Sequence, residues 1–191
     1  PPAGISPAAW AAFIEAARWH RMGPLLHVRL APVVATLPAT LTAALQAEYR
    51  QNALWGVALA TAAGQVLSTL TAADIEPAVL KGMAMGEVLY HNLALRPTTD
   101  LDLLVPHADV SKVKAALLAL GFEDQGLAAE EQPHLRGEVA LHASLLAGEL
   151  RFGVDVHWRL AQHPAVMFHL AAEDWLPRSV PARIAGVPVR V

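Results

Sequence analysis

Hydrophobic residues follow a helical spacing through the first third of the chain. Ser6 and Pro7 mark one helix start, because a serine hydroxyl caps a helix and proline suits its first turn. A longer pattern with steps of three and four runs through Leu41, Leu45, Tyr49, Asn52, Trp55, Leu59, Ala63, Val66 and Leu70. Gly56 and Gly64 interrupt this pattern, so it predicts either one long helix or two. We therefore expect residues 1–75 to form a helical N-terminal region.

The pattern changes after Pro77. It predicts strands at residues 77–82, 100–106, 121–125, 138–146 and 150–160, helices at residues 83–92, 110–120 and 164–175, and a terminal hairpin. Strands that alternate with helices and are followed by several strands are typical of an α+β fold with a mixed sheet flanked by helices. We assign this core to residues 76–191, and we expect the natural chain to continue beyond residue 191.

Composition narrows the class of protein. Hydrophobic residues make up 54% of the 191 positions and charged residues 16%, which predicts a packed globular core. The absence of cysteine excludes a disulfide framework, a zinc–thiolate site and a thiol nucleophile. We expect a cytoplasmic protein with no membrane-spanning segment.

The charge distribution bears on the partners. The formal net charge is −3, and the 14 basic residues are scattered without a basic run. Because stable DNA or RNA binding depends largely on neutralising phosphates, we expect no stable DNA binding.

Two carboxylates stand out in the strand at residues 100–106. Asp100 and Asp102 are two positions apart, so they share the face opposite the one formed by leucines and valine. Like charges this close are unfavourable unless a cation neutralises them, and Mg²⁺ suits carboxylate oxygens. A solvated strand edge or a pair of loop-end caps would explain the same residues.

A third carboxylate lies in the strand at residues 150–160. Asp155, His157 and Arg159 share one face, and hydrophobic residues occupy the other. Asp155 either pairs with His157 or Arg159 on its own strand or serves as a third metal ligand. His142 and Ser144, on the polar face of the preceding strand, are candidates to border the same pocket.

Lys81 and Gly82 form a candidate phosphate site. They end a predicted strand where a helix begins, and glycine allows a phosphate to approach the backbone amides of a helix start. An ordinary turn is the alternative, and the glycine pattern of a P-loop is absent.

These residues together resemble a poorly characterised bacterial nucleotidyltransferase family of the DNA polymerase beta-like superfamily. The resemblance rests on Leu-Lys-Gly-Met-Ala (80–84), Leu-Tyr (89–90), Arg-Pro-Thr-Thr-Asp-Leu-Asp-Leu-Leu-Val (96–105), Leu-Gly-Phe (120–122) and Val-Asp-Val-His-Trp-Arg-Leu (154–160). It implies a minimal nucleotidyltransferase fold, in which Asp100, Asp102 and Asp155 bind Mg²⁺ or Mn²⁺. The superfamily usually has Gly-Ser where this chain has Lys81, Gly82 and Met83, so the usual hydroxyl for the nucleotide phosphate is missing.

The resemblance implies transfer of a nucleoside monophosphate from a nucleoside triphosphate, such as ATP, to a hydroxyl of an acceptor. Asp100, Asp102 and Asp155 are the expected catalytic residues, and Asp155 is also a candidate to accept the proton of the acceptor. Lys81, Gly82 and Arg96 are the expected contacts of the triphosphate, although Arg96 would also serve simply to neutralise the two aspartates.

The sequence does not distinguish among three classes of acceptor: a small molecule, a protein and an RNA end. Two other functions also remain: a phosphoesterase or nuclease that uses the same carboxylates, and an inactive relative that binds a nucleotide or a partner protein, of the toxin–antitoxin or regulatory type.

Overall fold

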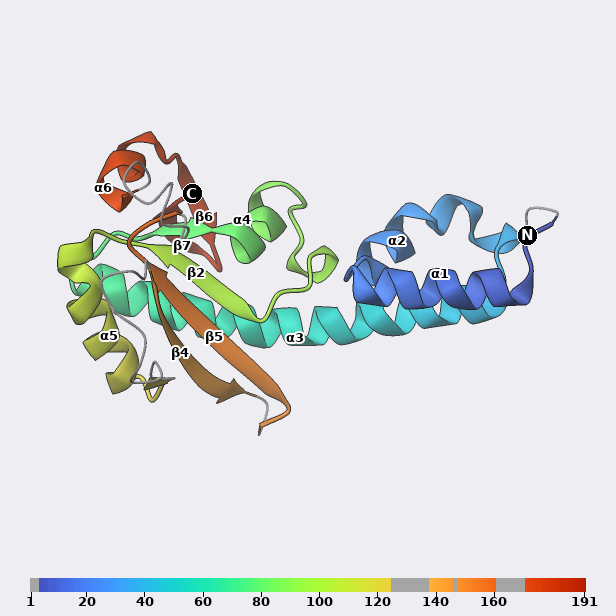
Figure 1. Ribbon diagram of the computed structural model, residues 1–191, viewed down its shortest axis with the longest axis horizontal. Helices are drawn as coiled ribbons and strands as arrows, with labels where there is room; N and C mark the ends of the chain where they lie inside the picture. Colours follow the sequence, from blue (N-terminus) through green and yellow to red (C-terminus); the bar gives the residue numbers. More distant parts are fainter. Residues whose placement is uncertain (1–3, 125–137, 146–147, 161–170) are drawn as a thin grey trace, which may run out of the picture.

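A helical arm and a sheet-containing core are joined by one long helix (Figure 1). The computed structural model describes residues 4–124, 138–145, 148–160 and 171–191. The helices and short 3-10 segments of the first part are α1 (Pro7–Trp19), α2 (Gly23–Arg29), η1 (Ala31–Thr36) and α3 (Ala39–Ala72). Ser6 caps α1 as predicted, since its hydroxyl accepts a hydrogen bond from the Ala9 N–H at 3.2 Å.

The helix α3 is continuous over 34 residues, which settles the question left by its two glycines. Its first half packs on the arm through Leu41 and Leu45, which form a small cluster with Ala17. Its second half enters the main core through residues such as Leu59 and Leu70. Tertiary packing at both ends therefore outweighs the low helix propensity of the glycines. The division of the chain at residue 75 stays a prediction.

The core is an α+β arrangement around a mixed seven-stranded sheet, as predicted. The strands are β1 (Ala78–Leu80), β2 (Asp100–Leu104), β3 (Glu123–Asp124), β4 (Glu138–Leu145), β5 (Leu150–His157), β6 (Pro181–Ile184) and β7 (Val187–Arg190), in the order β3-β4-β5-β2-β1-β7-β6. The β2–β5 and β1–β7 pairs are parallel, and the other pairs are antiparallel. The remaining helical segments are α4 (Lys81–Val88), η2 (Leu93–Leu95), η3 (His107–Asp109), α5 (Val110–Ala119), α6 (Ala172–Trp175) and η7 (Leu176–Arg178).

One face of the sheet carries the hydrophobic core. The inward residues are Leu101, Leu103, Phe152, Val154 and Val156, and they pack against α3 and α5. The alternation predicted from the sequence is therefore confirmed, and it leaves the aspartates of β2 and β5 on the opposite face. At one end of that opposite face, Ala172 of α6 packs on Ala78 and Leu104.

Some element boundaries differ from the sequence-based prediction. The strand expected to reach Gly82 ends at Leu80, because Lys81 has a φ of 47° and already begins α4. The terminal hairpin is confirmed as β6 and β7. Of the helix predicted at residues 164–175, residues 161–170 lie outside the described part of the chain, and α6 covers the end of the range.

The sequence of α3 bears on the expectation that no segment spans a membrane. Residues 51–73 carry neither charge nor proline, and α3 is long and apolar enough to cross a membrane by length and composition alone. A core helix of a soluble protein passes the same test. Nine residues of α3 are buried within the protein. The length and composition of α3 are therefore only weak evidence for a membrane span.

We predict that Gly64→Ala stabilises the protein. A Cβ at position 64 would lie 3.5 Å from the Cβ of Ala185, which is an ordinary contact, and alanine favours the helix by about 0.5–1 kcal/mol over glycine. Urea denaturation should show this gain in the free energy of unfolding. The control is Gly121→Ala, which should destabilise because Gly121 has a φ of 87°. A loss of stability in Gly64→Ala would contradict the prediction.

Candidate functional site

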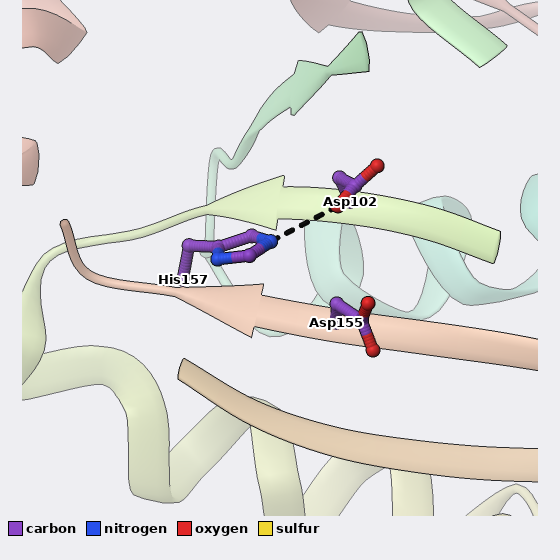
Figure 2. A group of neighbouring side chains, drawn as sticks. All are labelled: Asp102, Asp155 and His157. Atoms are coloured by element: carbon purple, nitrogen blue, oxygen red, sulfur yellow. Dashed lines mark hydrogen bonds and ion pairs between the residues drawn. The ribbon is translucent and has the colours of Figure 1, made fainter. Parts of the chain in front are cut away.

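The pairing of β2 with β5 brings the candidate residues to one face of the sheet. In this parallel pair, Asp102 lies opposite Asp155, and Asp100 lies opposite Gly153. Residues opposite one another project from the same face, so Asp100, Asp102, Asp155 and His157 all face away from the hydrophobic core. Figure 2 shows Asp102 and Asp155 side by side on the two strands, with the His157 ring directed toward Asp102.

Asp102 is the buried centre of this group. Its side chain is 4% exposed, and its Oδ1 accepts hydrogen bonds from Lys81 Nζ at 2.8 Å and from His157 Nε2 at 3.0 Å. Burial alone would raise the pKa of Asp102, but the hydrogen bonds from His157 and Lys81 outweigh it and lower the pKa below its usual value. The carboxylate is therefore ionised at neutral pH and accepts from an N–H on His157 Nε2.

Asp155 completes a group that is able to hold a metal ion. One carboxylate oxygen from each of Asp102 and Asp155 and one ring nitrogen of His157 all lie within 4.8 Å of one another. Asp102 and His157 are buried and Asp155 is half-buried. Two carboxylates this close fit a divalent cation, and His157 would join them as a ligand only in place of its hydrogen bond to Asp102.

Asp100 lies outside that group. Its Oδ1 accepts a hydrogen bond of 2.6 Å from the hydroxyl of Thr98. Thr98 in turn packs against Gly82, where a Cβ would lie only 2.4 Å from Thr98 Oγ1. The glycine at position 82 thus makes room for the threonine that holds Asp100.

The two basic candidates occupy different surroundings. Lys81 opens α4 and reaches the buried Asp102, although its own side chain is 61% exposed. Arg96 donates a hydrogen bond of 3.2 Å to the carbonyl of Pro97. It forms no ion pair with Asp100 or Asp102, all three being described residues, so it does not neutralise the aspartates by direct contact.

His142 borders the same face from β4. It lies opposite Gly153, and a Cβ at position 153 would come within 3.1 Å of the His142 ring. Arg151 donates a hydrogen bond to His142 Nδ1 at 3.2 Å, which requires that nitrogen to be unprotonated. Burial and then the charge of Arg151 lower the pKa of His142, and the nearby Asp155 and Asp100 oppose this shift.

A cavity of about 600 Å³ opens beside His142 and Arg151, between β4, α3 and the turn that follows α5. The catalytic candidates Asp100, Asp102 and Asp155 do not line it. We therefore place the site at the carboxylates rather than at this cavity.

The family comparison agrees with this geometry. A family model described as an uncharacterised nucleotidyltransferase matches residues 6–191. The chain belongs to this nucleotidyltransferase family. Searches of curated proteins and of solved structures gave no significant match.

Sequence reasoning found part of this site. It selected Asp102 and Asp155, which the structure brings together, and Asp100, which lies two residues from Asp102 and is held by Thr98. It missed the bond from His157 to Asp102 and the role of Thr98. The β2–β5 register would have revealed the first contact, but that pairing joins residues about fifty positions apart and is not readable from a local pattern.

We predict that Gly82→Ala is destabilising and that Thr98 is the reason. The added methyl group would force Thr98 to move and release Asp100, and overpacking of this kind costs about 1–3 kcal/mol. Thr98→Ala should relieve part of the clash, so the double variant should be more stable than the sum of the single effects. Strict additivity in urea denaturation would show that the two residues do not contact each other.

We predict that the pKa of His142 lies below 6.5 and rises in Arg151→Ala, because a neighbouring positive charge is removed. NMR titration of the imidazole protons measures both values, and Arg159→Ala, which alters no charge acting on His142, is the control. The pKa of His142 is lower in the folded state than in the unfolded state. The contribution of neutral His142 to the free energy of unfolding is therefore complete above about pH 6.5, and it is lost as the pH falls through the folded-state pKa. An unchanged pKa in Arg151→Ala would contradict the assignment.

Proposed function

We propose that the protein transfers a nucleoside monophosphate from a nucleoside triphosphate to a hydroxyl of an acceptor, in a reaction that requires Mg²⁺ or Mn²⁺. The observation that carries this proposal is the pairing of Asp102 with Asp155 on adjacent parallel strands. One possible metal-ligand atom from each of these carboxylates and from His157 lies within 4.8 Å of the others. The chain also belongs to a nucleotidyltransferase family.

The residues fit a bound cation. Carboxylate oxygens are the ligands that Mg²⁺ and Mn²⁺ prefer. The Lys81 ammonium group already places a positive charge on Asp102, which indicates that this buried carboxylate needs a cationic partner. Asp102 and Asp155 would hold the metal, and Asp100 would join them from two residues along β2.

The transfer reaction would use the bound metal together with side chains of this chain. When bound, the metal would neutralise charge on the triphosphate. The acceptor oxygen forms a bond to the α-phosphorus, the bond from that phosphorus to the bridging oxygen breaks, and pyrophosphate leaves. Asp155, half-buried beside Asp102, would accept the hydroxyl proton.

Lys81 and Gly82 have related roles in this proposal. The Lys81 side chain is 61% exposed, so its ammonium group would be able to exchange the Asp102 carboxylate for an oxygen of the triphosphate. Gly82 lies in the first turn of α4, and its buried backbone would become accessible to a phosphate when Thr98, which packs against it, moves aside. The guanidinium group of Arg96 would contact the triphosphate after exchanging its hydrogen bond to the Pro97 carbonyl for one to a phosphate oxygen.

The inactive relative is the second candidate, because Lys81, Gly82 and Met83 include no hydroxyl. A hydroxyl is nevertheless close by: Thr98 Oγ1 lies where a side chain at position 82 would begin. We assign the missing phosphate contact to Thr98, whose hydroxyl would exchange its hydrogen bond to Asp100 for one to the phosphate. This contact favours an active enzyme over the inactive relative.

We predict that nucleotide binding depends on metal and on the paired aspartates. Wild type should bind one nucleoside triphosphate with Mg²⁺ in isothermal titration, and label from α-labelled triphosphates should be transferred with release of pyrophosphate. Asp102→Asn and Asp155→Asn should each weaken metal-dependent binding at least about tenfold, since they remove a charged ligand. The matched control is Asp109→Asn, whose carboxylate pairs with Lys112 in a different part of the protein.

The outcomes separate the candidates. Binding without any transfer would favour the inactive relative. Equal metal-dependent binding of the nucleoside triphosphate by wild type and Asp102→Asn would contradict the proposed metal site. If the folded wild-type protein bound no nucleoside triphosphate, the transferase proposal would be overturned.

A further inference from the structure

A second cavity lies where the helical arm meets the core. It has a volume of about 400 Å³, which is within the range of small-molecule sites. Its walls come from the end of α1 and the turn after it, from the middle of α3, and from the loop that leads into β2. The residues that matter for the argument are Arg18, Arg21, Glu48, Trp55 and Thr98.

The loop that forms one wall is fixed to α3. The buried Asn52 of α3 donates a hydrogen bond of 2.7 Å to the carbonyl of Ala94 in η2. In Figure 1 the segment between α4 and β2 extends toward the arm, beside α2. The cavity is therefore bounded by ordered elements on its arm side and on its core side.

The cavity is linked to the candidate catalytic site through one lining residue, Thr98. Thr98 lines the cavity, and its hydroxyl donates the 2.6 Å hydrogen bond to Asp100. A molecule in the cavity that touches Thr98 is thus separated from the Asp100 carboxylate by a single side chain. This is the position an acceptor needs if its hydroxyl is to reach a metal held by the aspartates.

The charges in the wall select the class of ligand. Arg18 is paired with Glu48 at 3.1 Å and with Glu15 at 2.9 Å. Arg21 forms no ion pair with any residue that the structure describes, so the cavity wall carries an uncompensated positive charge. Trp55 adds a large apolar surface. The wall therefore suits an anionic group held by a guanidinium fork, attached to a body that packs on an indole ring.

We propose that this cavity binds the acceptor, and that the acceptor is a small alcohol that carries an anionic group such as a phosphate or a carboxylate. Arg21 holds the anion, Trp55 contacts the body of the molecule, and the hydroxyl points past Thr98 toward Asp100. The oxygen of that hydroxyl forms the new bond to the α-phosphorus, pyrophosphate leaves, and Asp155 takes the proton. This inference rests on the proposed transferase function and names its substrate class.

The experiment uses the full chain, Mg²⁺ and α-labelled nucleoside triphosphates. The acceptor source is the small-molecule fraction of a bacterial cell extract, divided on an anion-exchange resin into a retained and an unretained pool. We expect a labelled small-molecule product from the retained, anionic pool alone. Arg21→Gln should raise the KM for this pool about tenfold or more, because a charged hydrogen bond is lost, with a smaller change in kcat.

Two controls keep the outcomes distinct. Arg29→Gln removes an exposed arginine of α2 that does not line the cavity, and it should behave as wild type. Titration with a non-hydrolysable triphosphate analogue reports the proposed function separately, and Arg21→Gln should bind this analogue as wild type does.

The acceptor proposal is overturned, with the transferase function intact, if the analogue binds but label enters the unretained pool. It is also overturned if the analogue binds and neither pool accepts label, or if Arg21→Gln uses the retained pool like wild type. If the analogue does not bind to wild type, the transferase function itself fails.

Discussion

The parallel pairing of β2 with β5 is the constraint on which the site depends. A shift of one residue in this register would turn the side chains of one strand to the other face and bury aspartates in the hydrophobic core. The cost of burying unpaired carboxylates makes such a shift unfavourable. Leu101, Leu103, Val154 and Val156 fill the core side, so the packing that stabilises the sheet also places Asp102 opposite Asp155. Fold stability and site geometry thus have the same origin.

Charge balance around Asp102 is the second requirement. An ionised carboxylate that is 4% exposed is tolerated because Lys81 and His157 both donate to one of its oxygens. The two partners differ: His157 is buried and held within β5, while most of the Lys81 side chain is in solvent. His157 is therefore suited to orient the carboxylate, and Lys81 is suited to exchange with another cation. The left-handed backbone of Lys81 fits this view, since strained residues of this kind tend to occur at functional sites.

Much of the fold follows from local patterns, and the contacts within the site do not. Alternation along residues 100–104 and 150–157 was enough to place Asp100, Asp102 and Asp155 on polar faces. The start of α4 at Lys81 was missed because a positive φ has no reliable signal in a non-glycine residue. The Thr98–Asp100 bond depends on how the loop before β2 packs over Gly82, which is a tertiary contact between residues sixteen positions apart.

The continuous helix α3 fixes the position of the helical arm relative to the candidate site in the core. A helix of 34 residues is about 51 Å long, so one rigid element reaches from the α1 contacts to the centre of the core. Asn52, midway along it, fixes the η2 segment, and the loop that follows carries Thr98 to Asp100. Two separate helices broken at Gly56 would leave the angle between arm and core free to vary, and the cavity at their junction would have no fixed shape. The same packing that keeps Gly56 and Gly64 helical therefore helps to form the walls of the cavity, which include the Thr98 that bonds to Asp100.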